Sequence, residues 1–230
     1  MKKLLALLIA VALPFLLVVL SIRLVANPWF IDFEYHRPGF PPDVYGFTLA
    51  QRRPLALGGL YSVLPEGEGL SRLQQARLPD GSPAFNEREI KHMQDVRVLM
   101  AGVFPAMFIG WAVVVILGVA LRRVPGWQRV VPAGLKWGAL LTLALLAALI
   151  AYILVNFDSF FLTFHRLFFE GDTFMFAYTD TLIRLYPEQL WLDASILIGA
   201  LTVVMSAGLL AVGVVWQRRA NRPANGLYRE

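Results

Sequence analysis

Residues 135–156 read LKWGALLTLALLAALIAYILVN, and Lys136 is the only charged side chain among them. A helix needs about 20 residues to cross the hydrocarbon core of a bilayer. Because no water is present there to satisfy backbone N–H and C=O groups, a crossing segment has to be helical. This stretch therefore predicts a membrane-spanning helix, and it decides the fold class of the chain.

Three further stretches have the same character, and they run over residues 4–24, 98–121 and 192–216. The chain is 57% hydrophobic, well above a soluble domain. The first stretch resembles a signal peptide, since Lys2 and Lys3 precede it, but its apolar core exceeds the roughly 7 to 15 residues of such a signal. We expect an uncleaved helix and an all-α membrane core of four transmembrane helices.

The distribution of basic residues predicts the orientation, because Lys and Arg gather in cytoplasmic loops. One side collects Lys2, Lys3, Arg122, Arg123, Arg129, Lys136, Arg218, Arg219 and Arg222. Both termini are then cytoplasmic, and the protein lies in the cell membrane. The expected division is transmembrane helices at 1–26, 97–121, 135–157 and 192–216, an extracytoplasmic cap at 27–96, a cytoplasmic loop at 122–134, a second extracytoplasmic segment at 158–191 and a cytoplasmic tail at 217–230.

The first outer segment mixes helix and strand signals. TLAQ at residues 48–51 is a capping-box pattern, although Pro54 and Gly58-Gly59 weaken the helix that would follow. SRLQQARL at residues 71–78 fits a short helix or a strand, and Asp80-Gly81 is a hairpin signal. We expect a small α+β cap. In the second outer segment, the phenylalanines from Phe157 to Phe168 form one apolar face if the third helix continues past the bilayer.

The composition excludes several kinds of chemistry. The chain has no cysteine, which removes disulfides, thiol catalysis and thiolate metal sites. Its net charge of +5 is explained by the cytoplasmic clusters and requires no nucleic acid. No phosphate loop, dinucleotide fingerprint or Gly-x-Ser-x-Gly elbow is present. Glu89 and His92 form one Glu-x-x-His unit, but a di-metal bundle needs two. A zinc site would need His36 as a third histidine, so we predict no metal and no cofactor.

His92 and His36 both lie in the first outer segment. His36 belongs to the loop-like sequence EYHRPGF and reads as a surface residue. His92 belongs to NEREIKHMQDV, in which Asn86 is a candidate helix N-cap with Glu89 at the third position. Glu89 and Asp95 each lie about one helical turn from His92, so either carboxylate could orient the imidazole. The plainer interpretation is a solvated helix at the membrane interface.

His165 lies within FHRLFFEGDTF at residues 164–174. Phe161, His165 and Phe168 share a helical face, where a lone histidine is more often a packed core residue than a catalyst. Its position favours function, because His92 precedes the second span and His165 follows the third, on the same side of the membrane. Polar groups at membrane depth usually mark a functional site. If the helices are neighbours, the two rings can meet.

These two histidine blocks resemble those of the lipoprotein intramolecular transacylase family, Lit. The blocks are NEREIKHMQDV and FHRLFFEGDTF with TDTLIRLYPEQLW, and VYGFT with QRRPLA at residues 44–56 is a weaker third. The resemblance implies that His92 and His165 are catalytic. It implies transfer of the sn-2 acyl chain of diacylglyceryl-cysteine to the cysteine α-amino group, which gives a lyso-form lipoprotein, without a cofactor. The partners would be a lipoprotein N-terminus and membrane phospholipid, and the protein would be a monomer with its active site on the extracytoplasmic face.

Polar residues in the same blocks are expected to support the histidines. Asp95 is preferred over Glu89 for orienting His92, because it lies nearer the apolar span. Arg166 points about 100° away from His165 on a helix, towards headgroup phosphate or a cap carboxylate. The full supporting set is Asp95, Glu89, Arg166, Arg88 and Asp180.

Two other classes of protein fit the same residues. One is a non-catalytic accessory or sensor protein whose outer cap binds a peptide and whose histidines are structural. The other is a lipid ester hydrolase that uses the same histidines with water. The sequence does not distinguish transfer from hydrolysis, and it does not say which histidine is the base.

Overall fold

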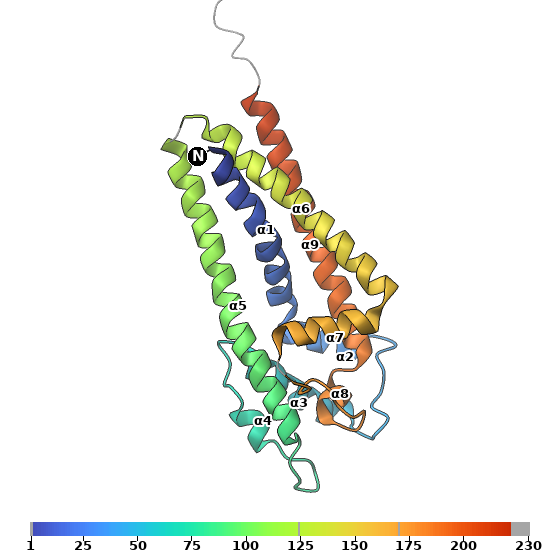
Figure 1. The fold of residues 1–230 in the computed structure, drawn as a ribbon. Coiled ribbons are helices and arrows are strands. Elements are labelled where there is room, and N and C mark those ends of the chain that lie inside the picture. The colour runs from blue at the N-terminus through green and yellow to red at the C-terminus, as the bar shows by residue number, and fades with distance from the viewer. Residues whose placement is uncertain (1, 124, 170, 222–230) are drawn as a thin grey trace, which may run out of the picture. The chain divides into compact units, whose positions relative to one another are not determined.

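The computed structural model describes residues 2–123, 125–169 and 171–221, and these residues are mostly helical (Figure 1). Four helices are long and apolar enough to cross a membrane by length and composition. They are α1 (Lys2–Val25), α5 (Glu87–Ala120), α6 (Trp127–Val155) and α9 (Glu188–Ala220). This confirms the predicted number of membrane-spanning helices. The helix α5 begins well before its apolar part, so His92 lies ahead of the membrane-spanning stretch.

Shorter helices lie between the long ones. They are α2 (Pro28–His36), α3 (Leu49–Val63), α4 (Ser71–Gln75), the 3-10 turn η1 (Leu121–Arg123), α7 (Phe157–Phe168) and α8 (Thr181–Leu185). The capping box predicted at the start of α3 is confirmed, because Thr48 and Gln51 exchange both hydrogen bonds. The structure also selects the helical alternative for the segment that forms α4.

The β part of the predicted cap is wrong, since the described residues of this segment contain one isolated β-bridge, between Arg77 and Pro83, and no strand. The hairpin turn itself forms: Gly81 has a φ of 85°, and its N–H donates to the carbonyl oxygen of Leu78 at 2.9 Å. Proline cannot donate to a β-ladder. Pro79 and Pro83 flank the turn, so the pairing does not extend into strands.

The chain divides into two compact units. Unit 1 comprises Met1–Ser21, Met107–Ala151 and Gly199–Glu230. Unit 2 comprises Ile22–Ala106 and Tyr152–Ile198, so it contains α2, α3, α4, α7, α8 and all three histidines.

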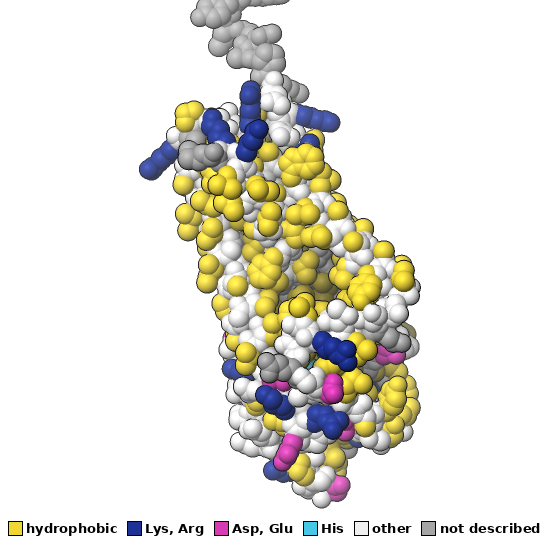
Figure 2. Space-filling model, viewed as in Figure 1, with side chains coloured by type: hydrophobic (Ala, Val, Ile, Leu, Met, Phe, Trp, Pro, Cys, Tyr) yellow, Lys and Arg dark blue, Asp and Glu magenta, His cyan; other side chains and the backbone are white. Residues whose placement is uncertain are grey.

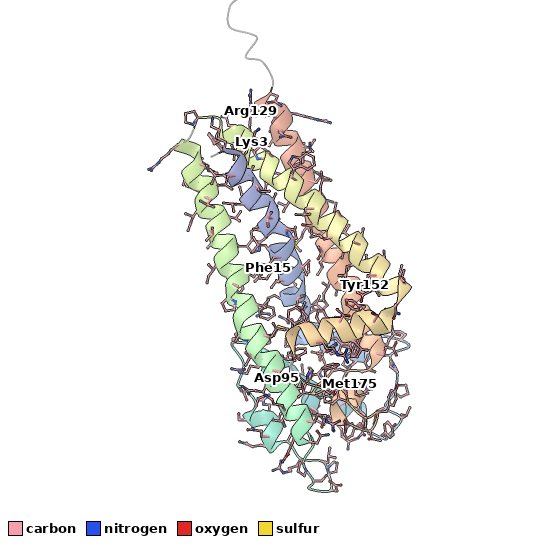
Figure 3. The ribbon with its side chains drawn as sticks, viewed as in Figure 1. Lys3, Phe15, Asp95, Arg129, Tyr152 and Met175 are labelled. Carbon is pink, nitrogen blue, oxygen red and sulfur yellow. The ribbon has the colours of Figure 1, made fainter. Side chains whose placement is uncertain are left out.

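Unit 1 is packed through small residues on α6. A Cβ added at Gly138 would lie 2.6 Å from the Leu13 side chain, and one at Gly134 would lie 2.9 Å from Ile9, so both glycines allow α1 to approach closely. Lys3 and Arg129 lie at the same end of this unit (Figure 3), where Lys and Arg side chains gather on the surface (Figure 2). Arg222, from the predicted basic set, lies outside the described residues.

Hydrogen bonds from two tyrosine hydroxyls join the short helices of unit 2. The Tyr35 hydroxyl donates to the carbonyl oxygen of Leu185 at 2.7 Å, which ties α2 to α8. The Tyr186 hydroxyl donates to the carbonyl oxygen of Ala56, which ties the end of α8 to α3. A side chain at Gly59 would overlap the Tyr186 hydroxyl, which gives a physical reason for a glycine within α3.

The third long helix does not continue into the phenylalanine-rich segment, a continuation that the sequence left open. At Asn156 the backbone leaves the helical region, with φ −158° and ψ 91°, and the Asn156 side chain accepts a hydrogen bond from the Ser159 N–H at 2.8 Å. Asn156 therefore caps a new helix, α7. Figure 1 shows that α7 lies across the direction of α5 in unit 2.

Candidate active site

The first turn of α5 is built around Glu89. The Asn86 N–H donates to the Glu89 carboxylate at 2.7 Å, and the Asn86 side chain accepts from the Glu89 N–H at 3.0 Å, which confirms the predicted cap. Glu89 is fully buried and also accepts the N–H of Leu182 in α8 at 2.6 Å. Burial raises the pKa of Glu89, against the opposing effect of the backbone N–H groups that it accepts. Glu89 therefore ties α5 to α8 and is not directed at His92.

Further hydrogen bonds join the same two segments of unit 2. The Asn86 amide donates to Asp180 at 3.0 Å, and the Thr181 hydroxyl donates to the carbonyl oxygen of Ala84 at 2.5 Å. Arg88 donates to the carbonyl oxygen of Met175 at 3.1 Å. Figure 3 shows Met175 in the segment that follows α7 and Asp95 on α5. Arg88 and Asp180, both expected as supporting residues, thus hold residues 175–182 against the start of α5.

His92 is enclosed by aromatic rings. Its imidazole contacts Phe169 at 5.2 Å and Phe176 at 5.3 Å between ring centroids, both edge-on. Its Nδ1 atom is buried and has no hydrogen-bond partner among the residues that the structure describes. Burial is the main cause that lowers the pKa of His92, to about 4, and the neighbouring His165 lowers it further.

Asp95 does not accept from that buried nitrogen. Its carboxylate pairs with Lys91 at 3.0 Å and accepts from the Thr173 hydroxyl at 3.3 Å. Asp95 influences His92 through its charge, which raises the pKa of His92 and so opposes the effect of burial. The two carboxylates expected to compete for His92 therefore bond elsewhere: Glu89 bonds to α8, and Asp95 bonds to Lys91 and Thr173.

His165 is held in one orientation by α7. Its Nδ1 lies 2.8 Å from the carbonyl oxygen of Phe161. Since a carbonyl oxygen can only accept, Nδ1 carries the proton in the neutral ring, and the lone pair is on Nε2. The ring stacks on Phe174, with centroids 4.8 Å apart and planes 28° apart. Burial lowers the pKa of His165, partly offset by the bond to Phe161.

The two histidines share one aromatic neighbour. The ring of Phe169 lies 5.2 Å from that of His92 and 5.9 Å from that of His165, between centroids. Phe169 and Phe174 are both buried. These rings were not predicted as part of the site, although both belong to the sequence FHRLFFEGDTF that contains His165. They place two neutral imidazoles in one apolar environment.

The remaining candidate residues, His36 and Arg166, lie at the surface. His36 is exposed, and its Nδ1 contacts the carbonyl oxygen of Asp32 at 2.7 Å within α2. Arg166 is exposed on α7. Across residues 2–123, 125–169 and 171–221, no group of three or more His, Cys, Asp or Glu side chains is arranged to hold a metal ion. Among the described residues, the Nδ1 atom of His165 bonds to a carbonyl oxygen and the Nδ1 atom of His92 has no hydrogen-bond partner, so neither Nδ1 atom bonds to a hydroxyl.

Comparison with known proteins gives a consistent result. The family model "Lipoprotein intramolecular transacylase Lit" matches residues 7–191. An uncharacterized protein of Aquifex aeolicus (strain VF5) is 31% identical over 218 residues, which cover 95% of this chain and 97% of that protein. The chain also resembles the solved structure of the membrane integral lipoprotein intramolecular transacylase Lit from Bacillus cereus, with a TM-score of 0.77, 21% identity, and coverage of 95% and 97% of the two chains.

A variant of the Bacillus cereus protein with a histidine replaced by alanine matches with a TM-score of 0.72 and 20% identity, over 95% of this chain and 94% of that one. The family match extends over most of the sequence, and both histidine blocks lie within it. The four apolar helices agree with a membrane-integral fold. The chain therefore belongs to the lipoprotein intramolecular transacylase family Lit, and it is a multi-pass membrane acyltransferase.

Proposed function

We propose that this protein moves the sn-2 acyl chain of a diacylglyceryl-cysteine from the glycerol oxygen to the α-amino group of the same cysteine. In this reaction the ester C–O bond breaks, an amide C–N bond forms, and the amine proton ends on the glycerol oxygen. Nothing else is consumed. The observation that carries the proposal is the pair of neutral imidazoles around Phe169, one with its basic nitrogen fixed by the bond to Phe161.

The base in this proposal is His165. An α-amino group has a pKa of roughly 8, so a neutral imidazole is a suitable acceptor for its proton near neutral pH. Burial lowers the pKa of His165, which keeps the ring neutral and ready to accept. The attacking nitrogen and the departing oxygen are bonded to the same tetrahedral carbon. The proton taken up on Nε2 can therefore be returned to the glycerol oxygen by the same residue.

The oxyanion donor in this proposal is His92. A buried N–H without an acceptor is costly, so the neutral ring is more stable with its proton on Nε2 than on the unpartnered Nδ1. The Nε2–H group then donates to the oxyanion of the tetrahedral intermediate. No protein nucleophile is needed, because the amine belongs to the substrate. Holding amine and ester together also supplies an effective molarity of about 10⁵ M or more.

The site is proposed to face the outside of the cell. The basic groups of unit 1, with Lys3 and Arg129 among them, favour a cytoplasmic placement of that end by the positive-inside rule. The proposed partners are a diacylglyceryl-modified lipoprotein N-terminus and membrane phospholipid, acted on by a monomer. Since the chain has no cysteine, single-cysteine variants can test the placement. Glu87→Cys should react with an impermeant thiol reagent on intact cells, and Arg123→Cys should not; the reverse pattern would contradict the orientation.

The function is tested in cells by mass spectrometry of lipoprotein N-termini. Expression in a bacterial strain whose lipoproteins keep a free α-amino group should produce N-acylated, mono-acylglyceryl cysteine. A variant carrying both His92→Ala and His165→Ala should leave the diacylglyceryl form unchanged. Recovery of a lipoprotein that has lost one acyl chain and kept its free amine would indicate hydrolysis instead of transfer.

A further inference from the structure

The helix α7 is amphipathic, and its exposed phenylalanine rings lie on one edge, beside the side that packs against the rest of unit 2. The packed side contains His165 and Phe161, which contact Phe174 at 4.8 and 6.2 Å between ring centroids. An α-helix turns about 100° per residue, so positions seven apart lie close to the same edge. By that spacing Phe157 and Phe164 define one edge of α7, and Ser159 and Arg166 define the other.

The apolar edge is open. Phe157, Phe164 and Phe168 expose 51%, 43% and 43% of their surface. Phe160 links them, with ring centroids 6.4 Å from Phe157 and 5.8 Å from Phe164. Phe164 in turn lies 5.1 Å from Phe168. A contiguous row of exposed aromatic rings on a soluble surface marks an interaction site.

The opposite edge is polar. The Ser159 hydroxyl contacts the Tyr152 hydroxyl at 3.1 Å, and Arg166 is exposed. Thr163 lies near this edge and also contacts Tyr152, at 3.4 Å. An apolar edge rich in Phe and an opposite edge with Arg are typical of a helix that lies in the plane of a membrane interface.

The apolar edge also continues a surface that belongs in the membrane. The last residues of α6, a candidate membrane span, are highly exposed at Leu154 (81%) and Val155 (84%), and Phe157 follows directly after the break at Asn156. In Figure 1, α7 lies across α5, another candidate span, within unit 2. A helix that follows a span and crosses the span direction lies along the membrane surface.

We propose that α7 is an interfacial helix, with the edge Phe157, Phe164 and Phe168 among lipid acyl chains and the edge Ser159 and Arg166 in the headgroup layer. The occupant of the apolar edge is thus the lipid of the leaflet that the site faces. His165 lies between the two edges, three residues from Phe168 and one from Arg166. The helix therefore places its imidazole at the depth where acyl chains join glycerol, and this last consequence rests on the proposed function.

The placement is tested with single nitroxide labels, since the cysteine-free chain carries no competing thiol. The variants Phe157→Cys and Phe164→Cys report the apolar edge, and Ser159→Cys and Arg166→Cys are their matched partners on the polar edge. Each labelled protein is reconstituted in vesicles of phosphatidylethanolamine and phosphatidylglycerol. Collision rates are then measured with oxygen, which concentrates in the acyl region, and with a nickel chelate, which remains in water.

The ratio of oxygen to nickel accessibility should be at least several-fold higher at positions 157 and 164 than at 159 and 166. Val204→Cys, exposed within α9, serves as the lipid reference, and Glu87→Cys serves as the aqueous reference. Equal nickel accessibility at 164 and 166 would place α7 in water and overturn the proposal. Exclusion of both reagents from 164, with spin–spin broadening that disappears on dilution with unlabelled protein, would show that a second copy covers the edge and would also overturn it.

The depth of His165 is tested separately by activity. Phe164→Asp places a charge on the apolar edge, and Thr163→Asp places the same charge one residue away, near the polar edge. Activity on a bilayer-embedded diacylglyceryl peptide should fall at least tenfold for Phe164→Asp and less than threefold for Thr163→Asp. Equal activities would refute the depth-setting role. Since the label experiment requires no turnover, a failure of the proposed function would not alter its result.

Discussion

His165 donates its Nδ1 proton to the carbonyl oxygen of Phe161 at 2.8 Å, one turn earlier in α7. This bond leaves Nε2 as the only nitrogen of the ring with a free lone pair. The two residues are also in ring contact, with centroids 4.0 Å apart. The orientation of the proposed base is thus set within its own helix. The proposed oxyanion donor His92, in contrast, is held by Phe169 and Phe176.

His92→Ala and His165→Ala should each reduce lyso-lipoprotein formation by at least a thousandfold, while the proteins still accumulate in the membrane. Residues that act as a unit have non-additive effects, so the double variant should be no more than a few-fold worse than either single variant. Turnover of each purified variant measures this directly. Retention of most activity by either single variant would remove that histidine from the mechanism.

Protonation of His92 should lower the stability of the folded protein. Its pKa is lowered to about 4, against an unfolded value near 6.5, so the unfolded chain binds more protons between these pH values. The contribution of the neutral His92 ring to the stability of the folded protein is fully present above pH 6.5. It is lost as the pH falls towards 4, and the loss is on the order of 1–2 kcal/mol for a partly buried group. Thermal unfolding in detergent from pH 7.5 to pH 4.5 should show a smaller loss for His92→Gln than for the wild type. Identical pH profiles would contradict this assignment.

Glu89→Gln and Asp95→Asn should differ in their effect on stability, because the Glu89 carboxylate joins two segments and the Asp95 carboxylate acts on His92 through its charge. Glu89 accepts the N–H of Asn86, just before α5, and the N–H of Leu182 in α8. A glutamine side chain can replace only part of this hydrogen bonding, so Glu89→Gln should cost about 2–3 kcal/mol of stability. Asp95→Asn should leave the unfolding temperature within about 2 °C of the wild-type value, because an ion pair with one exposed partner, such as Lys91–Asp95, contributes little. Unfolding curves of both variants test this, and the opposite order of stability would contradict it.

Phe169→Leu and Phe168→Leu form a matched pair at adjacent positions. Phe169 is buried and contacts both histidines, whereas Phe168 is exposed. Phe169→Leu keeps the site apolar but removes the ring between the imidazoles, so turnover should fall at least tenfold. Phe168→Leu should remain within threefold of the wild type. If the two variants lost activity equally, the shared ring would have no particular role in the site.

The sequence predicted those features that depend on local pattern. The four spans follow from uninterrupted apolar stretches, and the caps at Thr48 and Asn86 follow from residues three positions apart. The sequence left open whether the third span continues past Asn156, because the apolar character continues through Phe157 and only the side-chain bond to Ser159 favours a new helix. The β part of the cap was predicted from a turn signal that does form, while the flanking prolines limit the pairing.

The geometry of the site depends on contacts between segments that are distant in the sequence, and no local sequence pattern predicts such contacts. Helical spacing placed both Glu89 and Asp95 one turn from His92, and Asp95 was preferred for orienting the ring. In the structure the Glu89 carboxylate bonds to Leu182, far along the chain, and the Asp95 carboxylate bonds to Lys91 and Thr173. Phe169 and Phe176 reach His92 only because the segment after α7 folds back on α5 in unit 2. Helical spacing identifies neighbours within a helix, and tertiary packing determines which of them interact.

The most direct test of acyl transfer is tandem mass spectrometry of a synthetic diacylglyceryl-cysteine peptide incubated with the purified protein in lipid. Transfer within one molecule leaves the total mass unchanged, and the fragment ions should place one acyl chain on the α-amino nitrogen. The same peptide with an acetylated amine should not react. A product that has gained water and lost a fatty acid, formed equally from the acetylated peptide, would contradict transfer and identify the protein as an ester hydrolase.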